Sequence, residues 1–279
     1  MLNGTDLIYR YDGSLDGFLC CVYAAMTKRE HPMMIVRADE MQSLLFPDFI
    51  VETDSGKATR VADSIRAKIS EDMLDFVYQV LLTALPGKET ILLSLIRHAF
   101  KVGAGLLNDL TDPDVNKLSR AVTHLCREAH LYRGFVRFQQ NENALVAIIE
   151  PKNQVLPLLL NHFTDRFSTE NFLIYDKTHR QALIHSADSL NAPARVCIVP
   201  LEDLTAPQPD ECESNFRALW RMFHKTIAIT QRENPVCQRT LMPKRYWPQM
   251  VEHQKDERTN ILPPGYSPEG SLAAAYAVH

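Results

Sequence analysis

The sequence predicts an α+β protein, with a mixed or antiparallel sheet that contains hairpins and a four-helix lobe at about residues 57–133. Two observations support this class. Apolar residues recur at helical spacing through four successive segments of that lobe, which are separated by Ser70, by Pro86-Gly87 and by the stretch from Gly103 to Asp112. On both sides of it, short runs rich in β-branched and aromatic residues are bounded by turn residues, as is typical of strands. We expect the strands on the two sides to build one sheet region.

The N-terminal sequence predicts a strand, a turn, a helix and a second strand. Residues 6–11 are rich in β-formers, Asp12-Gly13-Ser14 is a turn, and Ser14 is placed to cap a helix over 15–26. Residues 33–38 form the next strand, and a connector with a short strand near 49–51 follows. A helix that begins after such a turn can bind an anion at its N-terminus. We favour a purely structural role, because a single glycine is a weak signal.

Four helices should follow, beginning near Lys57, Glu71, Lys88 and Pro113. Ser70 and Asp112 are suited to cap two of them, and Pro113 suits a first helical position. The second should run to Leu85, and the fourth should end at Gly134. That fourth helix leads into a strand at 135–138, in which Phe135 and Arg137 would face opposite to Val136 and Phe138.

The remaining chain reads as hairpins, one helix and a C-terminal helical part. Strands are expected at 135–138 and 145–149, a helix at 154–167, strands at 171–176 and 181–185, and a further strand at 196–199. An amphipathic helix should span 211–230, with Trp220 in the core. We expect one domain over residues 1–252, with the helical lobe inserted between strand-containing parts, and a loose tail over 253–279.

Composition sets limits on the function. The chain has 279 residues, a net charge of −4 and 46% hydrophobic residues, so any nucleic-acid contact must use a local basic patch. The absence of a signal sequence and of a long apolar run favours a cytoplasmic protein without a membrane partner. No metal and no cofactor is expected. The cysteines are scattered and are expected to be reduced core residues: Cys20, Cys21, Cys126, Cys197, Cys212 and Cys237.

Four motifs carry a resemblance to a known family. In chain order they are YRYDGSLDGFLCCVY, REAHLYRGFVRF, LPLLLNHFTDRF and LWRMFHKTIAITQRENPVCQRTLMPKRYW. Together they resemble the DUF4130 family over roughly residues 5–252. The resemblance implies a role in DNA metabolism beside a radical SAM protein of DNA repair or modification. Other members are fused to a uracil-DNA glycosylase-like domain, which makes such a protein a second possible partner. No catalytic residue is implied.

Histidines and arginines gather in the second and third motifs. The candidate catalytic residues are His130, Arg133, Arg137, His162 and Arg166. His162 and Arg166 are four residues apart and share a helix face. If His130 and His162 converge, they could perform acid–base chemistry. The alternative is a set of structural ion pairs, for example between Arg137 and Glu128. Asp176 could orient a histidine, but we favour a turn role for it.

The last motif is the most strongly charged. Between Arg217 and Trp247 the chain has seven cations and a single carboxylate, with aromatic residues interleaved. Cations and aromatic rings together suit a phosphate backbone with stacked bases, although a solvated helix face would look the same. The expected nucleic-acid-binding residues are Arg221, Lys225, Arg232, Arg239, Lys244, Arg245, Tyr246 and Trp247.

These features lead to one main hypothesis and two alternatives. The main one is a DNA-associated accessory protein that binds DNA weakly and acts with a radical SAM repair partner. The first alternative is an enzyme that acts on a nucleic-acid base or phosphate through the histidine and arginine residues. The second is a protein–protein adaptor whose basic segment docks an acidic partner.

Overall fold

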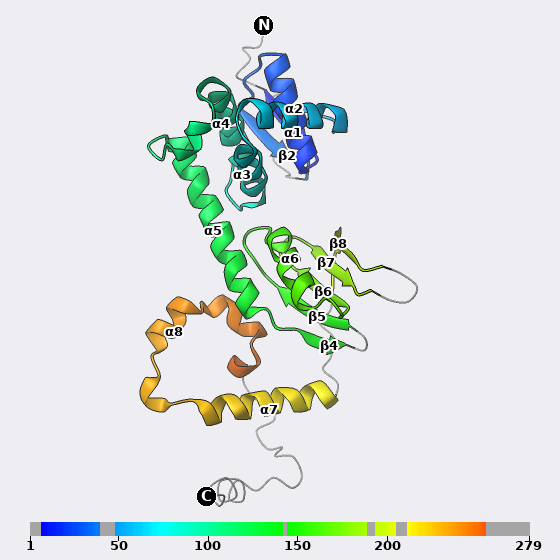
Figure 1. Cartoon of the computed structure of the whole chain (residues 1–279), viewed down its shortest axis with the longest axis vertical. Coiled ribbons are helices and arrows are strands. Elements are labelled where there is room, and N and C mark those ends of the chain that lie inside the picture. Colours follow the sequence, from blue (N-terminus) through cyan, green and yellow to red (C-terminus); the bar gives the residue numbers. More distant parts are fainter. Residues whose placement is uncertain (1–6, 40–47, 142–143, 189–192, 205–210, 255–279) are drawn as a thin grey trace, which may run out of the picture. The chain divides into compact units, whose positions relative to one another are not determined.

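A computed structural model describes residues 7–39, 48–141, 144–188, 193–204 and 211–254. The chain divides into two compact units, Met1–Pro209 and Asp210–His279 (Figure 1). The first unit contains two separate sheets, and helices make up most of the rest. The α+β class is therefore confirmed, whereas the expectation of one sheet region is wrong.

The first sheet is wholly parallel. Its strands are β1 (Ile8–Tyr11), β2 (Met34–Arg37) and β3 (Asp48–Ile50), in the order β2-β1-β3. Helix α1 (Leu15–Thr27) links β1 to β2, and Ser14 caps it by accepting a hydrogen bond from the Gly17 amide. The predicted strand–turn–helix–strand order is confirmed here.

The helical lobe is formed by four helices and a short 3₁₀ segment. They are α2 (Ser55–Lys68), α3 (Glu71–Leu82), α4 (Lys88–Val102), η1 (Ala104–Asn108) and α5 (Pro113–Phe135). Ser70 and Asp112 cap α3 and α5 as predicted. Helix α3 ends at Leu82 rather than Leu85, because the Lys88 ammonium binds the carbonyl oxygens of Leu81 and Thr83 and fixes the turn there.

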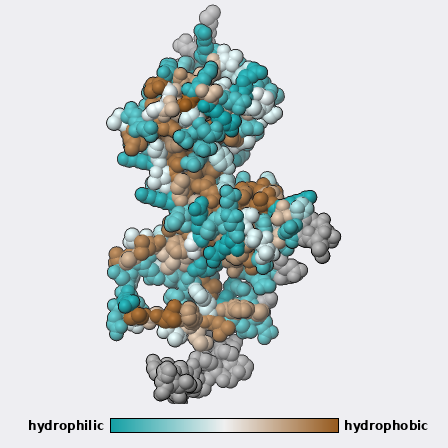
Figure 2. Space-filling view, in the orientation of Figure 1, coloured by the Kyte–Doolittle hydropathy of each residue, from teal (hydrophilic) through white to brown (hydrophobic). Residues whose placement is uncertain are grey.

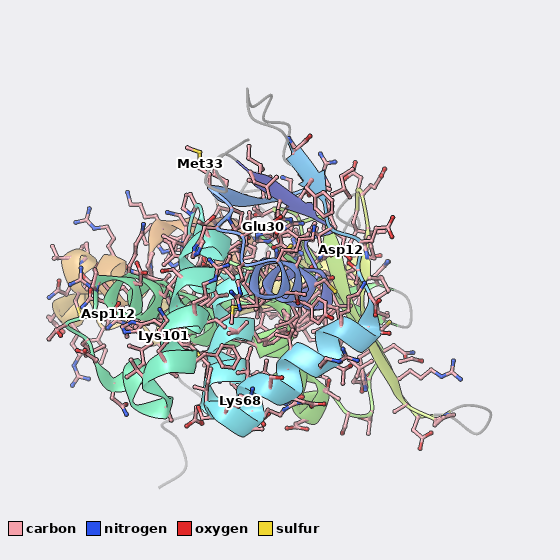
Figure 3. All side chains as sticks on the ribbon, turned by 90° about the horizontal axis from the view of Figure 1, so that it is seen from above. Asp12, Glu30, Met33, Lys68, Lys101 and Asp112 are labelled. Atoms are coloured by element: carbon pink, nitrogen blue, oxygen red, sulfur yellow. The ribbon has the colours of Figure 1, made fainter. Side chains whose placement is uncertain are left out.

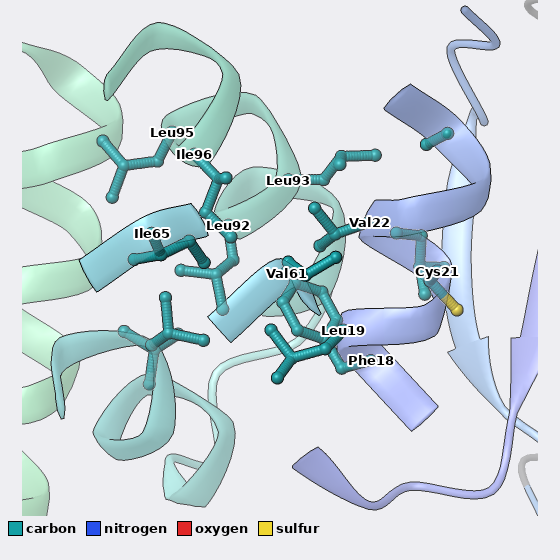
Figure 4. Packing of buried hydrophobic residues seen from close by; sticks show 14 of the residues in the cluster. Phe18, Leu19, Cys21, Val22, Val61, Ile65, Leu92, Leu93, Leu95 and Ile96 are labelled. Carbon is teal, nitrogen blue, oxygen red and sulfur yellow. The ribbon is translucent and has the colours of Figure 1, made fainter. Parts of the chain in front are cut away.

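One apolar core joins α1 to the helical lobe. Phe18, Leu19 and Val22 of α1 pack with side chains of α2 and α4, among them Ile65 and Leu92 (Figure 4). These five side chains are each at most 2% exposed. The first sheet is attached to the lobe through this core, since Tyr9, Tyr11 and Ile35 belong to the same cluster.

The second sheet is mixed. Its strands are β4 (Gln139–Asn141), β5 (Ala144–Ile149), β6 (Phe172–Asp176), β7 (Gln181–Ser186) and β8 (Arg195–Pro200), which are neighbours in chain order. Helix α6 (Leu156–Arg166) connects β5 to β6, and these two strands pair in parallel. The other pairs are antiparallel. They confirm the predicted hairpin of β6 and β7, whereas the first predicted hairpin forms with β4 in place of a strand at 135–138.

The predicted strand at 135–138 is wrong. Helix α5 continues through Gly134 to Phe135, its last turn closes with the Val136 amide on the Tyr132 carbonyl, and β4 begins only at Gln139. A glycine inside a helix costs only about 1 kcal/mol. Burial of Ala129 and Tyr132 on the same helix offsets that cost. The predicted alternation of faces from Phe135 to Phe138 therefore does not exist.

The described part of the second unit is made of helices and 3₁₀ segments. They are α7 (Glu211–Ile227), η2 (Thr230–Arg232), α8 (Pro235–Leu241), η3 (Lys244–Gln249) and η4 (Val251–His253). Helix α7 ends at Ile227, three residues earlier than predicted. Trp220 is 44% exposed, so its assignment to the core is wrong. Most of the predicted tail, residues 255–279, lies outside the described residues.

The cysteines differ from expectation. All six are free thiols, but only Cys20 and Cys21 are buried; the other four are exposed. The prediction that they are core residues holds for that adjacent pair alone. In the part of the chain that the structure describes, no helix combines the length and the apolar character needed to cross a bilayer.

Candidate nucleic-acid interface

The joint between α5 and the second sheet is organised by a buried carboxylate. Glu128 is 3% exposed and accepts hydrogen bonds from the Lys152 amide at 3.0 Å, the Asn153 amide at 2.9 Å and the Asn153 side-chain amide at 2.6 Å. The side-chain oxygen of Asn153 in turn accepts from the Ala84 amide at 2.8 Å. This network ties α5, the loop before α6 and the loop after α3 together. Asn153 was missed by the sequence analysis, because its partners are distant in the chain.

Three of the candidate catalytic residues lie near one another at α5 and α6. Arg133 donates from Nη2 to the Leu158 carbonyl at 3.0 Å, one helical turn before His162. Desolvation, followed by the nearby charges of Arg133 and Arg166, lowers the pKa of His162. Its Nε2 atom is buried and has no hydrogen-bond partner among the described residues. A neutral imidazole beside two guanidinium groups could accept a proton or contact an anion.

The other two candidates of that set are placed differently. Arg137 is half-buried and donates from Nη1 to the Gly134 carbonyl at 3.3 Å, which holds it against the end of α5. His130 is exposed on α5, next to the buried Ala129. The structure thus associates Arg133 and Arg166 with His162, and no described interaction links His130 to that group.

The aromatic residues of the second and third motifs pack with one another. Phe138 makes edge-to-face contacts with Phe163, Phe167 and Phe172, with ring centroids 5.0–6.1 Å apart. His185 stacks on Phe172 at 4.9 Å. Rings engaged in this way stabilise α6 on the second sheet, and they are not platforms for a base.

Asp176 acts as a turn residue, as favoured. It is 1% exposed, and its Oδ1 atom accepts from the amides of Thr178 and His179 at 3.0 and 3.1 Å. Its other oxygen lies 2.6 Å from His179 Nδ1. All of these contacts are within the β6–β7 hairpin, so they fix the hairpin turn.

The basic segment of the second unit, defined as Arg217–Trp247, presents most of its cations to solvent. Arg217 is the exception at its start: it pairs with Glu213 at 2.8 Å, and both side chains are largely covered. Arg221 is half-buried. The exposed cations are Lys225, Arg232, Arg239, Lys244 and Arg245.

Aromatic residues at the end of this segment position two of those cations. Arg245 lies over the Tyr246 ring at 4.8 Å and donates to its hydroxyl at 2.6 Å, while Tyr246 itself is only 4% exposed. Lys244 lies 5.8 Å from the Trp247 ring, which stacks on His253 at 4.3 Å. We therefore expect Tyr246 and Trp247 to orient cations, and we do not expect Tyr246 to stack on a base.

The start of α1 is occupied by a side chain of the protein. The Asp12 carboxylate accepts from the Ser14 amide at 2.9 Å, the Ser14 hydroxyl at 2.6 Å and the Thr53 hydroxyl at 2.9 Å. Asp12 is labelled in Figure 3. A Cβ added at Gly17 would lie 2.1 Å from Asp12 Oδ1, which shows how closely the carboxylate approaches the helix. A negative charge held at this place disfavours an external anion, in keeping with the structural role we favoured.

Comparison with known protein families shows a match. The model of a family described as a domain of unknown function, DUF4130, matches residues 86–252. The matched segment covers more than half of the chain and contains the second, third and fourth motifs; the first motif precedes it. No curated protein matches the sequence.

Proposed function

Because the chain belongs to the DUF4130 family, whose function is unknown, we propose a function from its surface chemistry: a DNA-associated accessory protein in DNA repair or modification. The observation that carries the proposal is the set of five exposed cations in the basic segment. They lie within 21 residues of one another in a chain whose net charge is −4, so positive charge is concentrated in this segment.

The side chains of the basic segment favour contact with phosphate groups over contact with base edges. Lysine and arginine side chains that are exposed and held near aromatic rings can neutralise a phosphate backbone without reading sequence. Binding through five such contacts should be weak and strongly salt-dependent. For duplex DNA, the logarithm of the affinity should fall with the logarithm of salt concentration with a slope of roughly −4.5 if all five contribute.

The test is a salt titration of DNA binding by fluorescence anisotropy. Charge reversal of Lys244→Glu with Arg245→Glu should weaken binding and reduce the slope by about 2. The matched control is Lys117→Glu with Arg120→Glu, which reverses one lysine and one arginine that are exposed on α5. Equal loss in both variants, or no binding by the unmodified protein at low salt, would contradict the proposal.

The partner forms a separate part of the proposal. We infer from the resemblance described above that the chain acts with a radical SAM protein of DNA repair; a uracil-DNA glycosylase-like protein is the second candidate. Copurification of tagged protein from its native cell, with and without nuclease treatment, tests this. Recovery of the partner only without nuclease would mean that DNA bridges the two. Recovery after nuclease would favour direct docking, and hence the adaptor alternative for the basic segment.

A second candidate function rests on His162. Its imidazole is half-buried, has a lowered pKa and has Arg133 and Arg166 as charged neighbours. This arrangement suits an enzyme that acts on a nucleic-acid phosphate or base, with the imidazole as the proton acceptor. Histidine NMR signals titrated with a nucleoside monophosphate test it: the His162 resonance should shift in the unmodified protein and remain unchanged in Arg166→Gln. No shift at saturating nucleotide would rule it out.

A further inference from the structure

Helix α7 exposes an apolar stripe. The stripe consists of five large side chains that are 44–64% exposed: Phe216, Leu219, Trp220, Phe223 and Ile227. Their spacing places them on one face of the helix. Figure 2 shows this hydrophobic surface along α7. Exposed apolar residues scattered singly are ordinary, but a continuous row of this size marks an interaction surface.

The second unit contacts α7 at one edge of the stripe, where Trp220 lies. Segment η4 contacts α7, and the Trp220 indole donates to Glu252 at 3.1 Å. The half-buried residues of α7 include Arg217, Ala218 and Arg221, which lie on the flank away from Phe216 and Phe223. Among the described residues, the middle of the flank opposite the stripe is therefore half-buried, while the stripe itself is exposed. This inverts the usual arrangement of an amphipathic surface helix.

The stripe is nearly symmetric under reversal of the helix. Around the midpoint between Leu219 and Trp220, Phe216 exchanges with Phe223, and Cys212 exchanges with Ile227. A second α7 laid antiparallel would therefore set phenyl against phenyl at two equivalent positions and large apolar groups at the centre. An isologous contact of this kind closes on itself as a two-fold dimer.

The charges along α7 favour the antiparallel direction. Glu211 and Glu213 are in the first turn, and His224 and Lys225 are in the last. Antiparallel packing brings the acidic end of one helix next to the basic end of the other. It also opposes the two helix dipoles, whereas parallel packing would place like ends together.

We propose that the apolar stripe of α7 is a homodimer interface, in which a second copy of this chain packs its own α7 antiparallel. The five side chains would bury roughly 600 Å² per copy, or about 1,200 Å² in total, which is at the lower limit of specific interfaces. The dimer should therefore dissociate on dilution. This inference uses no cation of the basic segment except at the helix end, and it does not depend on the proposed function.

Sedimentation velocity over a wide range of protein concentration tests the proposal. The unmodified chain should change from monomer to dimer as its concentration rises, and Phe223→Asp should remain monomeric. Val236→Asp is the matched control: Val236 is 67% exposed on α8, outside the stripe, so this variant should still dimerise. If the unmodified chain is a monomer at every concentration, the proposal is wrong. That conclusion holds even if Phe223→Asp weakens binding to another protein or to DNA.

A cross-link tests the direction of packing. In Ile227→Cys, the introduced thiol should form a disulfide with the native Cys212 of the other copy on mild oxidation. The same bond cannot form within one helix, because 15 residues of helix separate the two positions by about 22 Å. Ala228→Cys, just past the end of α7, is the control. Peptide mapping that finds the two introduced thiols bonded to each other, in place of a bond to Cys212, would overturn the antiparallel arrangement.

Discussion

Replacement of Glu128 should destabilise the first unit more than any surface change of similar chemistry. In Glu128→Ala, two backbone amides and the Asn153 side-chain amide lose their acceptor in a site that is 3% exposed at Glu128 and 8% at Asn153. Each buried donor left without a partner costs about 1–3 kcal/mol. Water entering the enlarged site satisfies part of this demand, so we expect a loss of about 3–5 kcal/mol in the free energy of unfolding.

Glu128→Gln separates hydrogen bonding from burial. The glutamine amide keeps the size of the side chain but replaces one acceptor oxygen with an NH₂ group. This NH₂ group then faces an N–H donor of Lys152 or Asn153. We expect a loss of roughly 2–3 kcal/mol, between the alanine variant and the unmodified protein.

Urea unfolding followed by circular dichroism measures both effects, and Glu150→Gln is the control. Glu150 pairs with Lys177 at 3.1 Å, but both side chains are more than half exposed, so its loss should change stability by less than about 1 kcal/mol. Equal unfolding midpoints for Glu128→Ala and the control would refute the conclusion that this carboxylate holds the joint together.

Three further predictions concern other parts of the first unit. Gly17→Ala should lower the free energy of unfolding by about 1–3 kcal/mol, because its methyl group would lie 2.1 Å from Asp12 Oδ1. The loss should be smaller when Asp12→Ala is also present. Urea unfolding of the unmodified protein, the two single variants and the double variant measures this difference. The pKa of His162, measured by NMR, should lie below its usual value of about 6.5 and should rise in Arg166→Gln. Because the unfolded chain binds the proton first, this group lowers the free energy of unfolding as the pH falls from 6.5 through the folded pKa. An unchanged pKa in the variant would contradict the contribution of the Arg166 charge. Alkylation at pH 8 should modify the exposed Cys126, Cys197, Cys212 and Cys237 quickly and the buried Cys20 and Cys21 slowly. Burial raises the pKa of Cys21 to about 12, which keeps its thiol protonated at this pH. Rapid labelling of Cys21, detected by mass spectrometry, would contradict its burial.

Local chemistry accounts for what the sequence predicts well. Ser14, Ser70 and Asp112 cap helices because a short polar side chain satisfies the amide two or three residues ahead, and both partners are adjacent in the chain. The hairpin of β6 and β7 is equally local, since Asp176 fixes its own turn. Such features need no knowledge of the tertiary structure.

Features that depend on distant partners are not visible in the sequence. Gly134 looks like a helix stop, yet α5 continues to Phe135, and Tyr132 in its last turn is only 5% exposed. The division of the strands into two sheets also depends on pairing between distant segments. The β5–α6–β6 crossover is parallel, and among the described strands none pairs both with that sheet and with β1. The roles of Glu128 and Asn153 likewise come from a contact across 25 residues.

For the candidate interface, the sequence predicts the density of positive charge in the basic segment, but it does not predict which of its side chains are exposed. The sequence identifies seven cations, and the structure shows that Arg217 is paired with Glu213, that Arg221 is half-buried and that the other five are exposed. Periodicity alone also placed Trp220 in the core, because a helical apolar row normally has a protein surface to pack against. The exposure of that row on α7 turns the same pattern into a predicted interface.

The two surfaces of the second unit make DNA binding and dimer formation separable. On α7, Lys225 lies about half a turn from the centre of the apolar stripe, so pairing of the stripes leaves it accessible. A dimer carries two basic segments, and linked sites bind more tightly than single ones without any new contact. Phe223→Asp should therefore weaken DNA binding although it removes no cation, whereas Lys244→Glu with Arg245→Glu should weaken it without changing the sedimentation of the free protein. Val236→Asp, which adds the same charge outside the stripe, measures the electrostatic part of the first effect. If Phe223→Asp and Val236→Asp bind DNA equally well while only the former is monomeric, the two basic segments do not act on one DNA molecule.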